Sequence, residues 1–324
     1  MFNDLDGKVK TFTDADIQIN GEYFLGQLEK LDQKLYGPIY STTYQRDIKF
    51  RSDVTLFDNA TSYQKVFFRA TDGDKTAHSE AYVNAAPGVD FETIKISNPL
   101  YYTNRMLDYN IIDLETSRRL NRPIDSMKIE ALAMVHHQEI ERIVYTGDTT
   151  KKTTGLLNNE DAITSQINLN ANWLQPTTKP DSIVKDFNDM LMAAWKRTNF
   201  NIMPSSMLIS PTLYGALVER KVSEAGNMSV LNYVLENNIA AKTGTNITIN
   251  PLRWLETGLT GAVENRIVLY TNEEQYIRLP YVPFQRFGEA SVQGLTFRAN
   301  YVSKFGHLEV IYPELLTYFK VKTA

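Results

Sequence analysis

Residues Ile124–Tyr145 read IDSMKIEALAMVHHQEIERIVY and carry the longest uninterrupted helical pattern in the chain. Apolar residues recur there at steps of three, four and seven, which places them on one side of a helix. They are Ile129, Leu132, Ala133, Ile140, Ile143 and Val144, with His136 in the gap of the stripe. Asp125 is placed to cap the start, and Gly147 suits the left-handed turn that follows a helix.

A helix of this length spans about 30 Å, the width of a small domain. Because its apolar stripe is narrow, we expect it to lie across a sheet or another subunit, as a strut and not as the wall of a pocket. The polar residues of the same stretch are predicted to point away from the stripe: Lys128, Glu130, His137, Gln138, Glu141 and Arg142.

Composition limits the classes of protein that remain. The 324 residues are 43% hydrophobic and 22% charged with a net charge of −4, which is typical of a globular protein of one or two domains. There is no global basic footprint for gripping nucleic acid, although a wall that only encloses DNA needs none. The absence of cysteine excludes disulfides and thiol chemistry and suits a cytosolic origin. No apolar run is long enough to span a bilayer, and Met1–Lys10 is too polar for a signal peptide.

The N-terminal part is predicted to be an arm and a helix. Residues 1–20 are mostly polar, and Gly21–Tyr36 has the pattern of an amphipathic helix. Its apolar face comprises Phe24, Leu25, Leu28, Leu31 and Leu35. This face fits equally well against its own domain or against a neighbouring chain.

A long β-hairpin is predicted next. Alternating patterns favour strands over Asp47–Phe57, Tyr63–Ala70 and Val89–Ile96, and residues 71–87 between the last two are polar with weak periodicity. Since an isolated two-stranded hairpin is marginal in water, we expect a partner to order it. Leu100–Ile112 is predicted to be extended, and Asp113–Leu120 to form a short helix.

The chain after Gly147 mixes helices with short strands. Asp181, Ser210 and Ser229 are candidate caps of three helices, and Met207–Ile209 reads as a buried strand. Residues 148 to about 270 are therefore predicted to form a compact α/β lobe. The remaining strands, out to Lys320, are predicted to return to the sheet beneath the long helix.

The sequence contains little evidence for motifs of catalysis, cofactor binding or metal binding. His136 and His137 are adjacent and about 100° apart on a helix, so they cannot chelate one ion as residues at i and i+4 do. Ser182-x-x-Lys185 and Lys242-Thr243-Gly244 mimic two penicillin-binding signatures, but the Ser-Asp-Asn element is absent. No glycine-rich phosphate loop occurs. We expect no catalytic residue, no cofactor and no metal, although phosphate contact at Lys151-Lys152 stays open.

Several phrases of the sequence are similar to one family. Asp113-Leu-Glu-x-x-Arg118 followed by Pro123-Ile-Asp125, Gly155-Leu-Leu-Asn158, and Gly306-His-Leu-Glu-Val-Ile-Tyr-Pro313 resemble tailed-bacteriophage major capsid proteins. Together with the order of parts, they resemble that Hong Kong-type capsid fold, which bacterial encapsulin shells share. The resemblance covers nearly the whole chain by architecture and implies an α+β fold.

The resemblance implies a division of the chain. Residues 1–45 would be the N-terminal arm and helix, and 46–147 with 271–324 the peripheral domain. The peripheral domain would carry the extended loop (about 60–97) and the spine helix (124–145), and 148–270 would be the axial domain. Too few residues precede the spine helix for a fused scaffolding domain, so a separate scaffolding protein is expected. Lys75 lies in the loop where some relatives form a Lys–Asn crosslink, but no partner can be named.

The implied function is a structural subunit of an icosahedral virus capsid that encloses double-stranded DNA. Its partners would be many copies of itself in hexamers and pentamers, a scaffolding protein and a portal, without a membrane. It would assemble in the host cytoplasm and reside in the virion. The residues expected at contacts between subunits are Phe24, Leu28, Leu31, Leu35, Asp72, Asp74, Lys75 and Tyr82. The alternatives are an encapsulin shell, another phage structural protein, and an unrecognised α/β enzyme.

Overall fold

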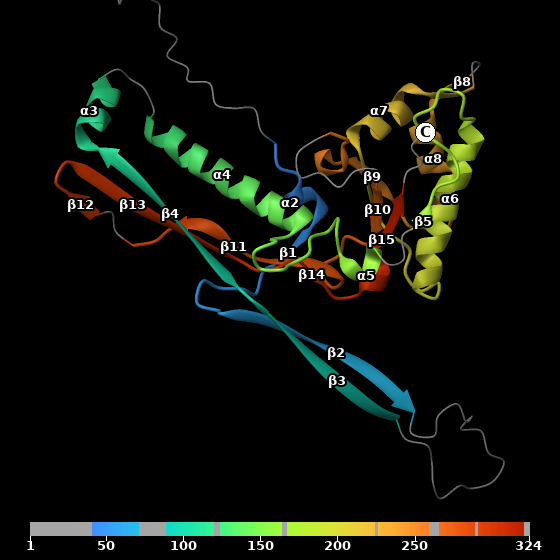
Figure 1. The fold of residues 1–324 in the computed structure, drawn as a ribbon, viewed down its shortest axis with the longest axis horizontal. Coiled ribbons are helices and arrows are strands. Elements are labelled where there is room, and N and C mark those ends of the chain that lie inside the picture. Colours follow the sequence, from blue (N-terminus) through green and yellow to red (C-terminus); the bar gives the residue numbers. More distant parts are fainter. Residues whose placement is uncertain are drawn as a thin grey trace, which may run out of the picture.

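The computed structural model describes residues 41–70, 89–119, 124–163, 167–223, 226–258, 266–288 and 291–320. Helices and strands are both abundant, and the strands fall into a six-stranded sheet, a five-stranded sheet and two-stranded pairs. In Figure 1 the six-stranded sheet lies under the long helix α4 on one side, and the five-stranded sheet lies among the shorter helices on the other.

The predicted strut is helix α4, Ile124–Thr146. It lies along the six-stranded sheet, which contains the elements β1 (Lys49–Arg51), β11 (Ile277–Arg286), β13 (Thr296–Phe305), β12 (Ser291–Gln293), β14 (Glu309–Val310) and β4 (Tyr101–Asn110). Burial alternates along β4, with Leu107 and Tyr109 buried and the even-numbered residues exposed. Along β4, one face is therefore covered, and the other is left exposed by the described part of the chain. The short helix α3 (Ile111–Arg119) follows β4.

The apolar stripe of α4 is confirmed at its C-terminal half and wrong at its start. Ile140, Ile143 and Val144 are buried, whereas Ile129 is 41% exposed. Glu141, predicted to point away from the stripe, is fully buried. Gly147 ends the helix with φ of +76°, and a Cβ there would collide with the carbonyl of Thr153.

The strands of the second sheet run in the order β5 (Ile167–Asn168), β15 (Thr317–Lys320), β10 (Arg266–Tyr270), β6 (Ser206–Ile209) and β9 (Thr248–Pro251). Four of these strands come from residues 148–270, the range predicted to form a lobe, and the fifth, β15, comes from the C-terminal end of the described chain. The lobe also holds α5 (Glu160–Ile163), α6 (Pro180–Arg197), α7 (Pro211–Glu219), β7 (Lys221–Ser223), β8 (Gly226–Ser229), α8 (Val230–Glu236), α9 (Ile239–Lys242), η1 (Arg253–Leu255) and η2 (Pro313–Leu315).

Two of the three predicted caps are confirmed. The Ser210 hydroxyl accepts a hydrogen bond from the Leu213 amide, and Ser229 accepts one from Asn232. Helix α6 instead begins at Pro180 after Lys179, so Asp181 lies in its first turn and does not cap it. An acidic residue there still interacts favourably with the positive end of the helix dipole.

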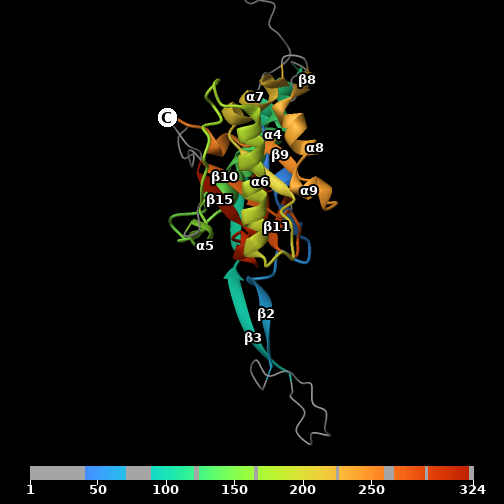
Figure 2. The same cartoon turned by 90° about the vertical axis from the view of Figure 1, so that its right-hand side faces the viewer.

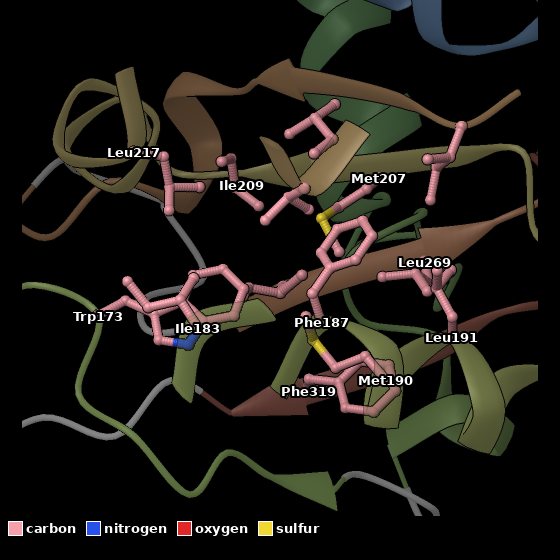
Figure 3. Close-up of a cluster of buried hydrophobic side chains, with 14 of the residues drawn as sticks. Trp173, Ile183, Phe187, Met190, Leu191, Met207, Ile209, Leu217, Leu269 and Phe319 are labelled. Atoms are coloured by element: carbon pink, nitrogen blue, oxygen red, sulfur yellow. The ribbon is translucent and has the colours of Figure 1, made fainter. Parts of the chain in front are cut away.

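The five-stranded sheet is apolar on both faces. Met207, Ile209 and Leu269 face one core, which they share with Ile183 and Phe187 of α6 (Figure 3). Leu208, Val268 and Tyr318 face the other side and pack with Ile140 and Val144 of α4. Because neighbouring residues of a strand point to opposite faces, these short strands contact both the lobe core and α4. They therefore join the part of the molecule that contains α4 and the six-stranded sheet to the part that contains the five-stranded sheet. We name these two parts the two halves of the molecule.

The N-terminal part differs from its prediction where it is described. Helix α2 (Tyr44–Asp47) and the short β1 replace much of the strand expected over Asp47–Phe57. The ion pair of Arg51 with Asp53 and the bonds from Thr55 to Asp58 accompany a turn that ends β1. The predicted helix Gly21–Tyr36 lies outside the described residues.

The last strands divide between the two sheets. Strands β11, β13 and β14 lie in the sheet beneath α4, as predicted. Strand β15 pairs with β10 and β5 in the five-stranded sheet, so the expectation that all of the last strands join the first sheet is wrong.

Candidate assembly surface

A two-stranded hairpin projects from the molecule. Strands β2 (Ala60–Ala70) and β3 (Val89–Pro99) pair in register over eleven residue pairs, from Ala60 with Pro99 to Ala70 with Val89. Figures 1 and 2 both show this hairpin extending away from the two sheets. We name β2 and β3 the hairpin arm. The long hairpin predicted from the sequence is confirmed for these strands, and its tip, residues 71–88, lies outside the described residues.

Both faces of the hairpin arm carry apolar side chains. Directly paired residues share a face of an antiparallel ladder, so Phe68 and Phe91 lie together on one face. Lys65 with Ile94 and Phe67 with Glu92 lie on the opposite face.

The outer half of the hairpin arm is uncovered by the described part of the chain. Phe68 is 80% exposed, Phe91 66% and Phe67 51%. Exposed apolar groups gathered in this way mark an interaction site, because single subunits seldom leave them in water.

The root of the hairpin arm is held by a buried carboxylate. Glu309 is 1% exposed and accepts a hydrogen bond from the Thr61 hydroxyl at 2.5 Å. Its other oxygen lies 2.7 Å from Nε of Arg278 and 3.5 Å from Arg51. The Leu100 amide also donates to the Asn59 carbonyl, which closes the base of the hairpin.

The open face of the six-stranded sheet carries an apolar hollow of about 260 Å³. The loop before β2 forms one side, where the Leu56 carbonyl accepts bonds from the Tyr102 hydroxyl and from Lys304. Phe57 and Phe287, both more than half exposed, form the rim. Within the described part of the chain, this hollow is a second uncovered apolar surface.

A larger hollow of about 490 Å³ lies where α6 ends against η2 and the start of β11. Tyr276 and Tyr312 line it in an edge-to-face pair, together with Arg197 and Glu314. Burial lowers the pKa of Arg197, which donates to the Leu316 carbonyl at 3.0 Å. Since Arg197 is engaged by the backbone and Glu314 is the one carboxylate in the lining, the hollow offers no pair of carboxylates for acid–base chemistry.

Charged groups are buried where α4 meets the second sheet. Asp47 is fully buried and accepts bonds from Arg46 at 2.6 Å and from the Tyr145 hydroxyl at 2.7 Å. Burial and the Asp47 carboxylate raise the pKa of Tyr145 well above its ordinary value, so its hydroxyl remains a donor. The Tyr270 hydroxyl donates to the Asp47 carbonyl, and Glu141 accepts from Thr43. These bonds fasten α2 to both halves of the molecule.

His136 and His137 point to different surroundings. His136 is buried against Phe284 and Tyr281, and neither of its ring nitrogens has a hydrogen-bond partner among the described residues. His137 Nδ1 lies 2.6 Å from the Tyr44 hydroxyl. Within the described ranges, no three His, Asp or Glu side chains gather as metal ligands would. No helix there is long and apolar enough to cross a bilayer.

The predicted contact residues fall in the parts of the chain that the structure does not describe. They are Phe24, Leu28, Leu31, Leu35, Asp72, Asp74, Lys75 and Tyr82. The residues that sequence reasoning passed over are Phe67, Phe68 and Phe91 of the hairpin arm. The sequence contained a sign of their exposure. Neighbouring apolar residues in a strand point to opposite faces of a two-stranded hairpin, and the rest of a single domain can cover at most one of these faces.

Comparison with known proteins agrees with this geometry. A family model described as "Major capsid protein" matches residues 76–320, well over half of the chain. No curated protein matches the chain significantly.

Solved structures share the fold over nearly the whole length. The capsid of Myoviridae phage XM1 aligns with a TM-score of 0.71 and 16% identity over 92% of this chain and 98% of that one. A chain of Gordonia phage Cozz aligns with a TM-score of 0.55 and 12% identity over 98% and 99%. The capsid of an empty GTA particle gives 0.52 and 11% over 96% and 100%. At such identities these likenesses concern the fold.

Proposed function

Since the chain belongs to the family of major capsid proteins, we propose that its copies close into an icosahedral shell around double-stranded DNA. The chain is a structural subunit of a capsid and not an enzyme. Its α+β major-capsid fold, predicted from the sequence, is confirmed.

The hairpin arm is the observation that carries the proposal. Phe68 and Phe91 sit on a two-stranded ribbon that the described part of the chain leaves uncovered. Burying them on an adjacent copy removes apolar surface from water at about 25 cal/mol per Å². Each subunit repeats this contact, so modest individual energies add up to a stable wall.

The further partners follow from the same proposal. The copies form hexamers and pentamers, and a separate scaffolding protein and a portal take part in assembly in the host cytoplasm. The net charge of −4 supports a wall that encloses DNA without sequence-specific binding.

We propose the following division of labour along the chain. Residues 1–45 form the arm and helix, 46–147 with 271–324 the peripheral domain, and 148–270 the axial domain. The axial lobe surrounds the centre of each capsomer. Phe24, Leu28, Leu31 and Leu35 of the N-terminal segment, and Asp72, Asp74, Lys75 and Tyr82 of the loop, contact neighbouring subunits.

Negative-stain imaging of the purified full chain tests this function. Closed icosahedral particles are expected, and discrete monomers or dimers would contradict the proposal. The contents of particles taken from the native source separate the alternatives. Double-stranded DNA supports a virus capsid, whereas enzyme cargo indicates an encapsulin shell.

Deleting residues 1–36 tests the N-terminal segment. The truncated chain is expected to keep one cooperative unfolding transition, because it retains every residue of the two described cores. It is expected to form no closed particles. Closed shells of the truncated chain would show that the segment is not an assembly element.

A further inference from the structure

The hairpin arm is attached to the body at one end. Its contacts with the body gather on the first residues of β2, where Thr61 is buried and Tyr63 is partly buried. Lys65 still reaches the Tyr312 ring, 5.8 Å from its centroid. From Val66 outward the described side chains of β2 are exposed. The direction of the hairpin arm is therefore set at its root.

Strand register places the carboxylate that holds this root. Glu309 of β14 stands directly opposite Arg278 of β11, and their side chains form an ion pair at 2.7 Å. Arg51, at the end of β1, approaches the same carboxylate oxygen at 3.5 Å. Arginines from two strands of the body, β11 and β1, thus hold one oxygen of Glu309, and its second oxygen accepts from the arm.

Thr61 supplies the contact from the arm. Its hydroxyl donates to Glu309 Oε1 at 2.5 Å, across 248 positions of sequence. Arg51 adds a long bond of 3.5 Å to the Ser62 carbonyl. A charge-assisted bond between buried groups has a narrow range of favourable directions, so it restricts how the arm can turn. We name Thr61, Glu309, Arg278 and Arg51 the root clasp.

A small rotation at the root clasp moves the outer end of the arm considerably. Eleven strand residues span about 37 Å at about 3.4 Å each. Turning such a lever by about 10° displaces its end by about 6 Å, more than the spacing between two strands. An apolar contact at that end would then be lost or made with a different partner surface.

We propose that the root clasp, through the hydrogen bond from Thr61 to the buried Glu309, is the positioning device that fixes the direction of the hairpin arm and thereby the size of the shell. This inference rests on the proposed function, because it assigns the arm to contacts between copies. Thr61 and Glu309 are positioning residues, and both are buried within their own subunit. A subunit without the clasp folds normally and joins its neighbours at variable angles, so particles of several sizes result.

Distance measurements by pulsed electron paramagnetic resonance report the direction of the arm in unassembled subunits. The chain has no cysteine, so spin labels attach only at Thr93→Cys on the arm and Lys196→Cys on α6, both exposed positions. The distance distribution is expected to become at least twofold wider when Thr61→Val is added. Thr61→Ser, which keeps the hydroxyl, is expected to restore the original width.

Particle sizes are measured with the same variants without labels. The unaltered chain and Thr61→Ser are expected to give one size class, and Thr61→Val a mixture. Thr212→Val is the matched control, because it removes a Thr–carboxylate bond of similar length, 2.6 Å to Glu256, in the other half of the molecule. This control is expected to change neither the width nor the particle size.

The outcomes separate this inference from the proposed function. An unchanged width in Thr61→Val overturns the role of the clasp in directing the arm. A wider distribution with uniform particles overturns its role in setting the size. Failure of the unaltered chain to close particles contradicts the proposed function instead, while the widths still report on the clasp.

Discussion

At the scale of single residues, His136 is the clearest pH-sensitive group of α4. Burial is the main reason that its pKa is lowered from 6.5 to about 4, and His137 and Arg105 lower it further. Tyr281 faces the ring from β11 without offering a carboxylate. A neutral ring between aromatic neighbours is stable, whereas a charged ring there would lose its hydration without gaining a partner.

The pH dependence of stability follows from this shift. Between pH 6.5 and about 4 the unfolded chain binds a proton at His136 and the folded chain does not, so the free energy of unfolding falls as pH falls. The loss reaches about 3 kcal/mol at its largest. Urea unfolding of the unaltered chain and of His136→Phe from pH 7 to 4 measures it. The variant is expected to lose this part of the slope, and identical slopes would contradict the assignment.

Gly155 is required by a close approach of two backbone segments. A Cβ built there lies 2.4 Å from the carbonyl oxygen of Tyr145 and 2.7 Å from the amide nitrogen of Gly147. Gly155→Ala is therefore expected to cost about 3 kcal/mol or more in the free energy of unfolding.

A second glycine provides the control for Gly155→Ala. Nothing lies within 4 Å of a Cβ at Gly215 in α7, so Gly215→Ala is expected to add about 0.5–1 kcal/mol. Chemical unfolding measures both variants. Equal effects in the two variants would contradict the collision at Gly155.

At the scale of elements, short sequence patterns correctly predicted the features that depend on residues close together in the chain. The caps Ser210 and Ser229, the arm strands β2 and β3, and the turn at Gly147 follow from short-range rules, and all are present. The predictions that failed concern residues whose burial depends on contacts with residues far away in the sequence. Glu141 is buried because Thr43, from 98 positions earlier, lies against it, and no helical period contains that contact.

For the candidate assembly surface, the hairpin was predicted from the sequence, but its exposed phenylalanines and its root clasp were not. The sequence indicated a hairpin that needs a partner, and the structure shows the hairpin arm with phenylalanines that the described residues leave exposed. The root clasp could not be foreseen, because Thr61 and Glu309 are 248 residues apart and meet through the register of β14 on β11. The contact residues predicted at 24–35 and 72–82 remain predictions.

The exposed phenylalanines of the arm should affect assembly and not folding. Phe68→Gln is expected to change the free energy of unfolding by less than about 0.5 kcal/mol, because the side chain is 80% exposed. Closed particles should become at least tenfold fewer by light scattering and imaging.

A buried phenylalanine gives the opposite result and serves as the control. Phe187, 2% exposed in the lobe core, is expected to cost about 3–5 kcal/mol when changed to Ala. Unaltered particle yield in Phe68→Gln would contradict the role of the arm.

At the scale of the whole molecule, the two halves share one of the two cores. Val268 and Tyr318 of the second sheet pack with Ile140 and Val144 of α4. Asp47 adds polar bonds to the same junction from α2. Such sharing predicts that the halves unfold together.

Unfolding of the subunit in urea tests that coupling. Fluorescence reports on Trp173 and Trp195 in the lobe and on Trp254, near Tyr145 at the junction, while circular dichroism reports on the helices. One coincident transition is expected. Asp47→Asn is expected to lower the free energy of unfolding by about 2–3 kcal/mol, because Arg46 and Tyr145 lose a charged acceptor. Two separate transitions in the unaltered chain would contradict a shared core.

The hairpin arm also has a consequence for how the protein must be made. Along the described arm, β2 and β3 pair only with each other, so the outer edge of each strand offers free amide and carbonyl groups that any similar ribbon can join. Lys65 and Lys95, by repelling like ribbons, discourage such misplaced pairing without preventing it. Subunits that accumulate faster than shells consume them are therefore drawn toward fibrous aggregates, and slow synthesis favours the particle.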